Sequence, residues 1–307
     1  MQGVRGRFGV FFAFSTPTFI WLLLFFVVPL GIIWLYSFGE NITITQIETT
    51  WTLDNYQRIL EPEILTLIGR SLWLAFVSTL ICLLVGFPMA LVIATASHNA
   101  KPWLLLLIML PFWTNLLIRT YALLNILGTR GRLNDVLRWL YEKTEQLLDM
   151  IGLGQLNLLG DGFTPLTMLG TPSGVIYGIV YVSLPFTVLP IYSALERMDK
   201  SYLEASMDLG AGQLDTVRHI LIPLAMPGLI TAAIITFIPA LGQFLIPDLL
   251  GRGQVDMIAN VIERQFKKAN DWPFGSAISL TLLYATFILL ALRSFNDAAR
   301  AKREGRM

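Results

Sequence analysis

Six long runs of apolar residues, nearly free of charged side chains, dominate this chain of 307 residues. A bilayer core is crossed by roughly 20 helical residues, and charged side chains are expensive inside it. The runs therefore predict six transmembrane helices in one all-α integral membrane domain that covers residues 1–307. Their approximate bounds are 10–38, 70–97, 102–128, 172–196, 218–247 and 273–294.

The composition supports this class and argues against others. Charged residues make up 14% of the chain, whereas soluble domains carry about 25%. The net charge of +1 lacks the basic excess of a nucleic-acid binder. The single cysteine, Cys82, lies in an apolar run and is predicted to be a packed side chain. The first run follows Arg5 and Arg7 as in a signal peptide, but it is too long for one and is interpreted as a retained span.

Basic residues predict the orientation of the chain. The N-terminal tail has Arg5 and Arg7, and the short link between the second and third runs has Lys101. The C-terminal tail carries more cations than acids. Since cytoplasmic loops are enriched in Lys and Arg, both termini are predicted to face the cytoplasm, as an even number of spans requires. A multi-pass protein of the bacterial inner membrane is expected.

The loop between the fourth and fifth runs is an exception to this charge bias. It is cytoplasmic by counting, yet acids outnumber cations between Glu196 and His219. Its polar centre predicts a short helix on the membrane surface over about 201–215, capped by Asp199 or Ser201 and interrupted at Gly210. A helix in that position is suited to docking a soluble partner.

Prolines occur within four consecutive runs and predict bent or broken helices. Two interpretations stay open: ordinary kinks in a bundle, or a bundle that encloses a pathway. The positions are Pro88, Pro111, Pro185, Pro190, Pro223, Pro227 and Pro239.

The acidic loop resembles the EAA signature of the permease subunits of ABC importers. Glu204-Ala205-Ser206, Gly210 and Pro223 keep the spacing of that pattern without a gap, and the departures are Ser206, Val217 and Ile222. The resemblance implies the six-helix bundle of the MetI-like, type I importer permeases, with a cytoplasmic coupling helix that fits a groove on an ATPase subunit. The implied coupling residues are Glu204, Ala205, Ser206, Asp208, Gly210, Ala211 and Pro223.

The chain has no nucleotide-binding motif of its own. It contains no Gly-x-x-x-x-Gly-Lys-Ser/Thr stretch, so it is expected to be a transport subunit and not an enzyme. ATP and magnesium would then be bound by a partner ATPase. Neither His98 nor His219 forms a metal-ligand spacing, so no cofactor or metal site is expected in this chain.

Three further segments resemble the polyamine-importer permeases of the PotB and PotH type. They are Pro111 to Tyr121 in the third run, Thr52 to Tyr56, and Asp271 to Gly275. This resemblance implies spermidine or putrescine as cargo. It also implies a second, PotC-like permease, a PotA-like ATPase dimer and a PotD-like extracytoplasmic binding protein.

A polycation in a low-dielectric bundle needs carboxylates, carbonyls or aromatic faces for compensation. The candidate pathway residues are Asp248, Gln243, Trp113, Asn115, Tyr121, Tyr177 and Tyr181. The aromatic members fit an interfacial belt equally well. Arg119 is expected near the outer interface, where it snorkels, pairs with an acid such as Asp248, or contacts the binding protein.

Two alternative functions remain open. An ABC importer permease for another small solute would share the coupling loop. A secondary transporter would show inverted repeats and midplane charges, and the sequence shows neither convincingly.

Overall fold

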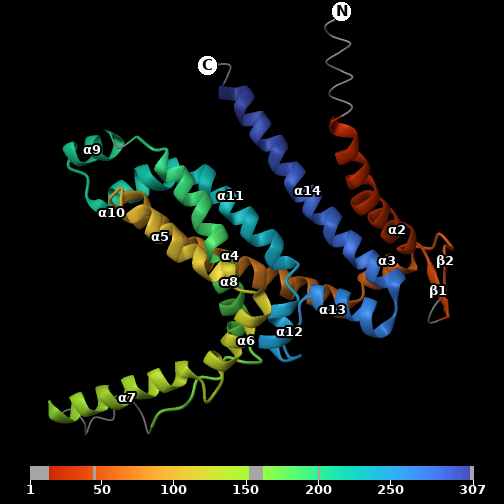
Figure 1. Cartoon of the computed structure of the whole chain (residues 1–307), viewed down its shortest axis with the longest axis horizontal. Coiled ribbons are helices and arrows are strands. Elements are labelled where there is room, and N and C mark those ends of the chain that lie inside the picture. Colours follow the sequence, from red (N-terminus) through yellow and green to blue (C-terminus); the bar gives the residue numbers. More distant parts are fainter. Residues whose placement is uncertain (1–13, 44–45, 152–161, 200, 305–307) are drawn as a thin grey trace, which may run out of the picture. The chain divides into compact units, whose positions relative to one another are not determined.

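The computed structural model describes residues 14–43, 46–151, 162–199 and 201–304, in which the regular elements are helices and one two-stranded hairpin (Figure 1). The chain forms two compact units. One, the terminal unit, comprises Met1–Thr66 and Val261–Met307, and the other, the central unit, comprises Leu67–Asn260. The predicted start of the first span, at residues 10–13, lies outside the described residues, as do Arg5 and Arg7.

The terminal unit pairs the helix of the first apolar run with the last helix of the chain. A helix from Phe14 to Tyr36 contains the π-turn η1, and its second part, α2, packs against α14. A two-stranded antiparallel hairpin follows α2, which the all-helical prediction did not include. The elements are η1 (Leu23–Val27), α2 (Val28–Tyr36), β1 (Glu40–Thr43), β2 (Gln46–Glu48), α3 (Asp54–Ile59), η5 (Gln265–Ala269) and α14 (Trp272–Glu304).

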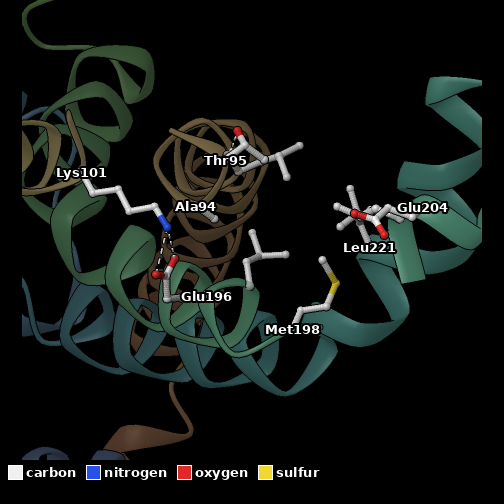
Figure 2. Close-up of a pocket in the computed structure, with 10 residues that line it drawn as sticks. Ala94, Thr95, Lys101, Glu196, Met198, Glu204 and Leu221 are labelled. Atoms are coloured by element: carbon white, nitrogen blue, oxygen red, sulfur yellow. Dashed lines mark hydrogen bonds and ion pairs between the residues drawn. The ribbon is translucent and has the colours of Figure 1, made fainter. Parts of the chain in front are cut away.

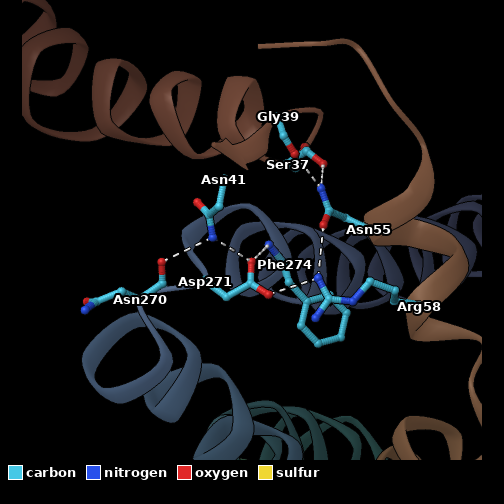
Figure 3. Close-up of polar contacts among 8 residues, drawn as sticks. All are labelled: Ser37, Gly39, Asn41, Asn55, Arg58, Asn270, Asp271 and Phe274. Carbon is cyan, nitrogen blue, oxygen red and sulfur yellow. Dashed lines mark hydrogen bonds and ion pairs between the residues drawn. The ribbon is translucent and has the colours of Figure 1, made fainter. Parts of the chain in front are cut away.

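Polar side chains fasten the hairpin and α3 to the start of α14 (Figure 3). Buried Asn55 donates to the carbonyl oxygens of Ser37 and Gly39, at the end of α2. Arg58 forms an ion pair of 2.9 Å with Asp271, and the same carboxylate accepts from the Phe274 amide in the first turn of α14. Asp271 therefore caps α14, which satisfies an amide that would otherwise lack a partner.

The central unit contains the remaining helices, and its boundaries with the terminal unit fall inside α4 and α13. The elements are α4 (Pro62–Thr95), α5 (Ala100–Met109), η2 (Leu110–Trp113), α6 (Leu116–Leu127), α7 (Arg132–Met150), α8 (Pro172–Glu196), α9 (Ser201–Asp208), α10 (Gln213–Thr216), η4 (Val217–Leu221), α11 (Ile222–Leu241), α12 (Leu245–Gly251) and α13 (Ile258–Arg264).

Helices α8 and α11 form the closest pairing in this unit. A Cβ atom added to Gly228 would lie 2.6 Å from the Ala194 Cβ and 2.8 Å from the Pro190 carbonyl oxygen. Beside this contact, the hydroxyls of Thr187 and Thr236 are 2.7 Å apart and buried. Small residues let membrane helices approach closely, and the hydroxyl pair adds an interhelical hydrogen bond.

Each predicted span coincides with a helical segment. Four helices are long and apolar enough to cross a bilayer: Phe14–Tyr36, Pro62–Thr95, Pro172–Glu196 and Gln213–Leu241. The third predicted span is a helix pair, Ala100–Trp113 and Leu116–Met150, bent by 93° at its break. In the sixth, the apolar part of α14 within the described residues is Trp272–Ile288. The count of six membrane crossings therefore stays a prediction.

Most of the prolines lie inside continuous helices and do not break them. Pro88 lies inside α4, and both α8 and α11 run through two prolines each. Pro111 alone stands at a break, where the chain leaves α5 and Asn115 caps a new helix. The fifth predicted span also ends early, because α11 stops at Leu241 and Gly242 follows as its C-cap.

Candidate functional site

The predicted coupling loop begins with a capped helix. The carboxylate of Asp199 accepts a hydrogen bond of 3.0 Å from the Ser201 amide. Hydrogen bonds from the Ser201 backbone and side chain lower the pKa of this carboxyl group. Helix α9 then runs from Ser201 to Asp208, with Glu204 exposed in its first turn. Of the two caps predicted, Asp199 makes this bond.

Gly210 ends α9 and explains why the signature has glycine there. Its φ is +78°, a left-handed conformation that disfavours side chains. One residue later, the Ala211 amide donates to the Ser206 carbonyl oxygen at 3.1 Å, which is the hydrogen bond of a Schellman C-cap. In this structure the predicted range 201–215 holds two helices, α9 and α10, on either side of the interruption that the sequence predicted at Gly210.

A buried hydroxyl pair ties α9 to the helix that follows. The Ser206 Oγ lies 2.8 Å from the Thr216 Oγ1, and both residues are buried. Thr216 also donates to the Gly212 carbonyl oxygen. From α10 the chain stays helical through η4, past Pro223 in the first turn of α11, as far as Leu241. The Ser206–Thr216 contact thus joins α9 to a long apolar helix.

The outer face of the loop presents both acids and apolar side chains. Glu204 and Asp208 are exposed on α9. Leu209 is 89% exposed and Leu214 is 84% exposed, although both are large and apolar. Exposed leucines beside carboxylates form a surface suited to a protein partner with an apolar groove and basic residues.

A pocket of about 420 Å³ lies behind α9 (Figure 2). It is lined by the ends of α4 and α8, by the start of α5, and by Leu203 and Glu204 of α9. Across one wall, the Lys101 ammonium contacts both carboxylate oxygens of Glu196, at 2.9 and 2.8 Å. The pair joins the start of α5 to the last residue of α8.

The elements that carry the pathway candidates contact one another, but the candidate side chains differ in their exposure. They lie at the η2–α6 break, on α6, on α8, on the α11–α12 link (Gln243) and in the first turn of α12 (Asp248), and α12 packs against both α6 and α8. Trp113, Tyr121, Tyr177 and Asp248 are exposed, whereas Tyr181 packs against the buried core. The pathway role of these residues stays a prediction.

Asn115 and Arg119 complete the break in the third predicted span. The Asn115 side chain accepts from the Leu117 amide and so caps α6. Arg119 is buried, and its guanidinium donates to the Thr114 carbonyl oxygen at 2.8 Å. Among the described residues no ion pair joins Arg119 to Asp248, so this structure does not show the pairing that was one of the alternatives for Arg119. The break leaves the Thr114 carbonyl without a helical donor, and Arg119 supplies one.

Two contacts at the coupling loop were missed from the sequence. The sequence held a signal for the Ser206–Thr216 pair, because both residues place a hydroxyl within an otherwise helical pattern. That the two hydroxyls meet depends on the turn at Gly210. The Lys101–Glu196 pair joins residues far apart in sequence and had no local signal.

Comparisons with known proteins agree on one family. The family model described as "binding-protein-dependent transport system inner membrane component" matches residues 6–299. The spermidine/putrescine transport system permease protein PotB of Escherichia coli is 41% identical over 270 residues, which cover 88% of this chain and 91% of that protein. The same-named protein of Haemophilus influenzae is 37% identical over 282 residues, covering 90% and 91%.

A solved structure shows the same fold. It is the crystal structure of a bacterial alginate ABC transporter in complex with an alginate pentasaccharide-bound periplasmic protein. The TM-score is 0.69 at 15% sequence identity, and the match covers 94% of this chain and 93% of that chain. At this identity the likeness concerns the fold alone.

Proposed function

The chain belongs to the family of binding-protein-dependent transport system inner membrane components, and we propose that it is the polyamine permease subunit of an ATP-driven importer. It would form half of the pathway for spermidine or putrescine across the bacterial inner membrane. The cargo assignment rests on the 37–41% identity to spermidine/putrescine permeases over about nine-tenths of the chain.

The coupling loop supplies the mechanism. In this proposal an ATPase subunit binds α9 through Glu204, Asp208 and the exposed Leu209. Closure of the ATPase dimer moves α9, and the Ser206–Thr216 contact passes the motion to the continuous helix Gln213–Leu241. That contact, which joins the docking helix to a candidate membrane span, is the observation on which the mechanism depends.

In this proposal the other functions of the importer belong to separate subunits. ATP and magnesium would be bound by the partner ATPase dimer, a second permease would complete the pathway, and a binding protein would deliver the polyamine. The exposed Trp113, Tyr121, Tyr177 and Asp248 are the proposed contacts for the cationic cargo. With both termini in the cytoplasm, the coupling loop would face the ATPase.

Charge reversal at Glu204 tests the coupling. We expect Glu204→Lys to abolish ATP-driven spermidine uptake in proteoliposomes that hold the complete importer, and to weaken copurification of the ATPase. Glu145→Lys, an exposed acid on α7, is the matched control and should leave both unchanged. Uptake driven by an ion gradient with this chain alone would contradict the proposal and support a secondary transporter.

The cargo is tested separately by competition. In the complete importer, unlabelled spermidine and putrescine should each suppress uptake of labelled spermidine, whereas an anionic oligosaccharide should not. If labelled polyamine is not taken up while the ATPase still associates through Glu204, the cargo assignment fails and the importer assignment stands.

A further inference from the structure

Helix α7 carries charges that prevent it from crossing a bilayer. Seven of its side chains between Arg132 and Asp149 are charged. It begins shortly after the last residue of α6, Leu127, at the predicted end of the third span. It extends away from the other helices of the central unit (Figure 1). A helix with this composition, so close to a span, lies either in water or at the membrane surface.

The N-terminal part of α7 is held firmly. Asn134 is buried; its side-chain amide donates to the carbonyl oxygens of Gly128 and Leu166, and its oxygen accepts from the Leu166 amide. Leu133 packs against the core of the central unit. These contacts fix the start of α7 relative to the end of α6, so its direction is set by the fold.

The apolar side of α7 is divided into a covered half and an uncovered half. On the covered half, the Tyr141 and Phe163 rings pack together with their centroids 6.1 Å apart and their planes tilted by 58°. Successive side chains of a helix point about 100° apart, so a separate stripe is formed by Val136, Leu140 and Leu147. Their side chains are 55%, 47% and 59% exposed. Nothing among the described residues covers this stripe.

The edges of the stripe have the side chains typical of a membrane boundary. Trp139, on one edge, is 57% exposed, and tryptophan favours the headgroup region. Lys143 projects from the same side, and its ammonium donates to the Gln146 side chain, towards the polar face. This arrangement places the lysine methylenes beside the stripe while the charge turns away from it, as in snorkelling.

The charges of α7, its fixed start beside α6, and the uncovered stripe with its edges point to one surface. From them we infer that α7 is an interfacial helix that inserts Val136, Leu140 and Leu147 into the lipid leaflet at which α6 ends. The partner of this surface is the phospholipid bilayer.

Collision accessibility of spin labels tests this inference in the complete importer. Each label is attached to one introduced cysteine in a Cys82→Ser background, in nanodiscs of phosphatidylethanolamine and phosphatidylglycerol. Val136→Cys and Leu147→Cys report on the stripe, and Glu142→Cys on the opposite face is the matched control. We expect the ratio of oxygen to nickel-chelate accessibility to be at least about threefold higher on the stripe, because oxygen partitions into lipid.

Two results would overturn the inference. Equal ratios on both faces would place the stripe in water, and exclusion of both reagents from the stripe would mean that protein covers it. A photoactivatable phospholipid gives an independent measurement on the chain without substitutions. Peptides from Arg132–Met150 should be labelled, and their absence among labelled peptides would also overturn it. Neither readout requires transport, so failure here is distinguishable from failure of the proposed function.

Discussion

Single residues in the signature segments have structural roles at turns and helix ends. Gly210 supplies a left-handed turn, Asn115 caps a helix, and Asp271 caps another while pairing with Arg58. These residues build helix ends and loops. The likeness to polyamine permeases therefore rests partly on shared architecture, and it does not by itself identify cargo contacts.

Replacing Gly210 should weaken coupling through the backbone alone. An added Cβ would meet no atom within 4 Å, yet φ is +78°, and a left-handed conformation costs a side-chain-bearing residue about 1–2 kcal/mol. We expect Gly210→Ala to lower uptake per ATP hydrolysed and to increase hydrogen exchange in α9. Gly253→Ala is the matched control, because Gly253 has a φ of +73° in equally open space outside the loop.

In the control, uptake should stay at the wild-type level despite a similar loss of stability. Equal losses of uptake in both variants would mean that general destabilisation, and not the end of α9, limits transport.

Arg119 should not be interchangeable with Asp248. Its buried guanidinium donates to the Thr114 carbonyl oxygen, and a carboxylate in its place would be a buried charge that cannot donate. We expect Arg119→Asp to lower both the melting temperature of the purified importer and its uptake. The double variant Arg119→Asp with Asp248→Arg should not recover either one. Recovery of uptake in the double variant would show that the two residues pair during transport.

At the scale of elements, the α8–α11 contact joins the coupling loop to the helical core. The Thr187–Thr236 bond lies along the same pair of helices that the loop connects at one end. Gly228 is the residue that allows the two backbones to approach. Since α11 continues from the coupling loop, we expect the α8–α11 contact to limit how far a displacement of α9 spreads.

A side chain at Gly228 should force these helices apart. The added Cβ would meet the Pro190 carbonyl oxygen at 2.8 Å, a backbone atom that cannot rotate away. We expect Gly228→Ala to destabilise the purified importer by roughly 1–3 kcal/mol, measured as a lower melting temperature. Gly69→Ala, in α4 with no atom within 4 Å of the added Cβ, should be neutral or stabilising because alanine favours helix. A neutral Gly228→Ala would contradict the close packing.

For the whole molecule, the orientation in the membrane follows from six crossings and the positions of the cations. We expect a cysteine introduced as Arg306→Cys, with Cys82 replaced by serine, to react with an impermeant maleimide in inside-out vesicles but not in intact spheroplasts. Glu61→Cys, in the predicted outer loop, should react in intact spheroplasts but not in inside-out vesicles. Reaction of both positions in the same preparation would require an even number of crossings between them, in place of the five predicted, and would revise the span count.

The sequence by itself determined the helical membrane class, the positions of the apolar helices, the coupling signature and the turn at Gly210. Each of these depends on local chemistry: hydropathy is a property of a residue against lipid, and a left-handed turn is a property of one backbone position. The sequence did not show which proline breaks its helix. Pro111 does so because Asn115 caps a new helix beyond it, whereas α4, α8 and α11 continue through theirs.

Only the tertiary structure decided the pairings. Arg58 with Asp271, Lys101 with Glu196, Ser206 with Thr216, and Gly228 against α8 all depend on where separate elements place their side chains. It likewise decided that half of the apolar side of α7 is covered and that the Val136–Leu147 stripe is not. Such contacts join positions that no sequence period relates, because they form only when helices pack.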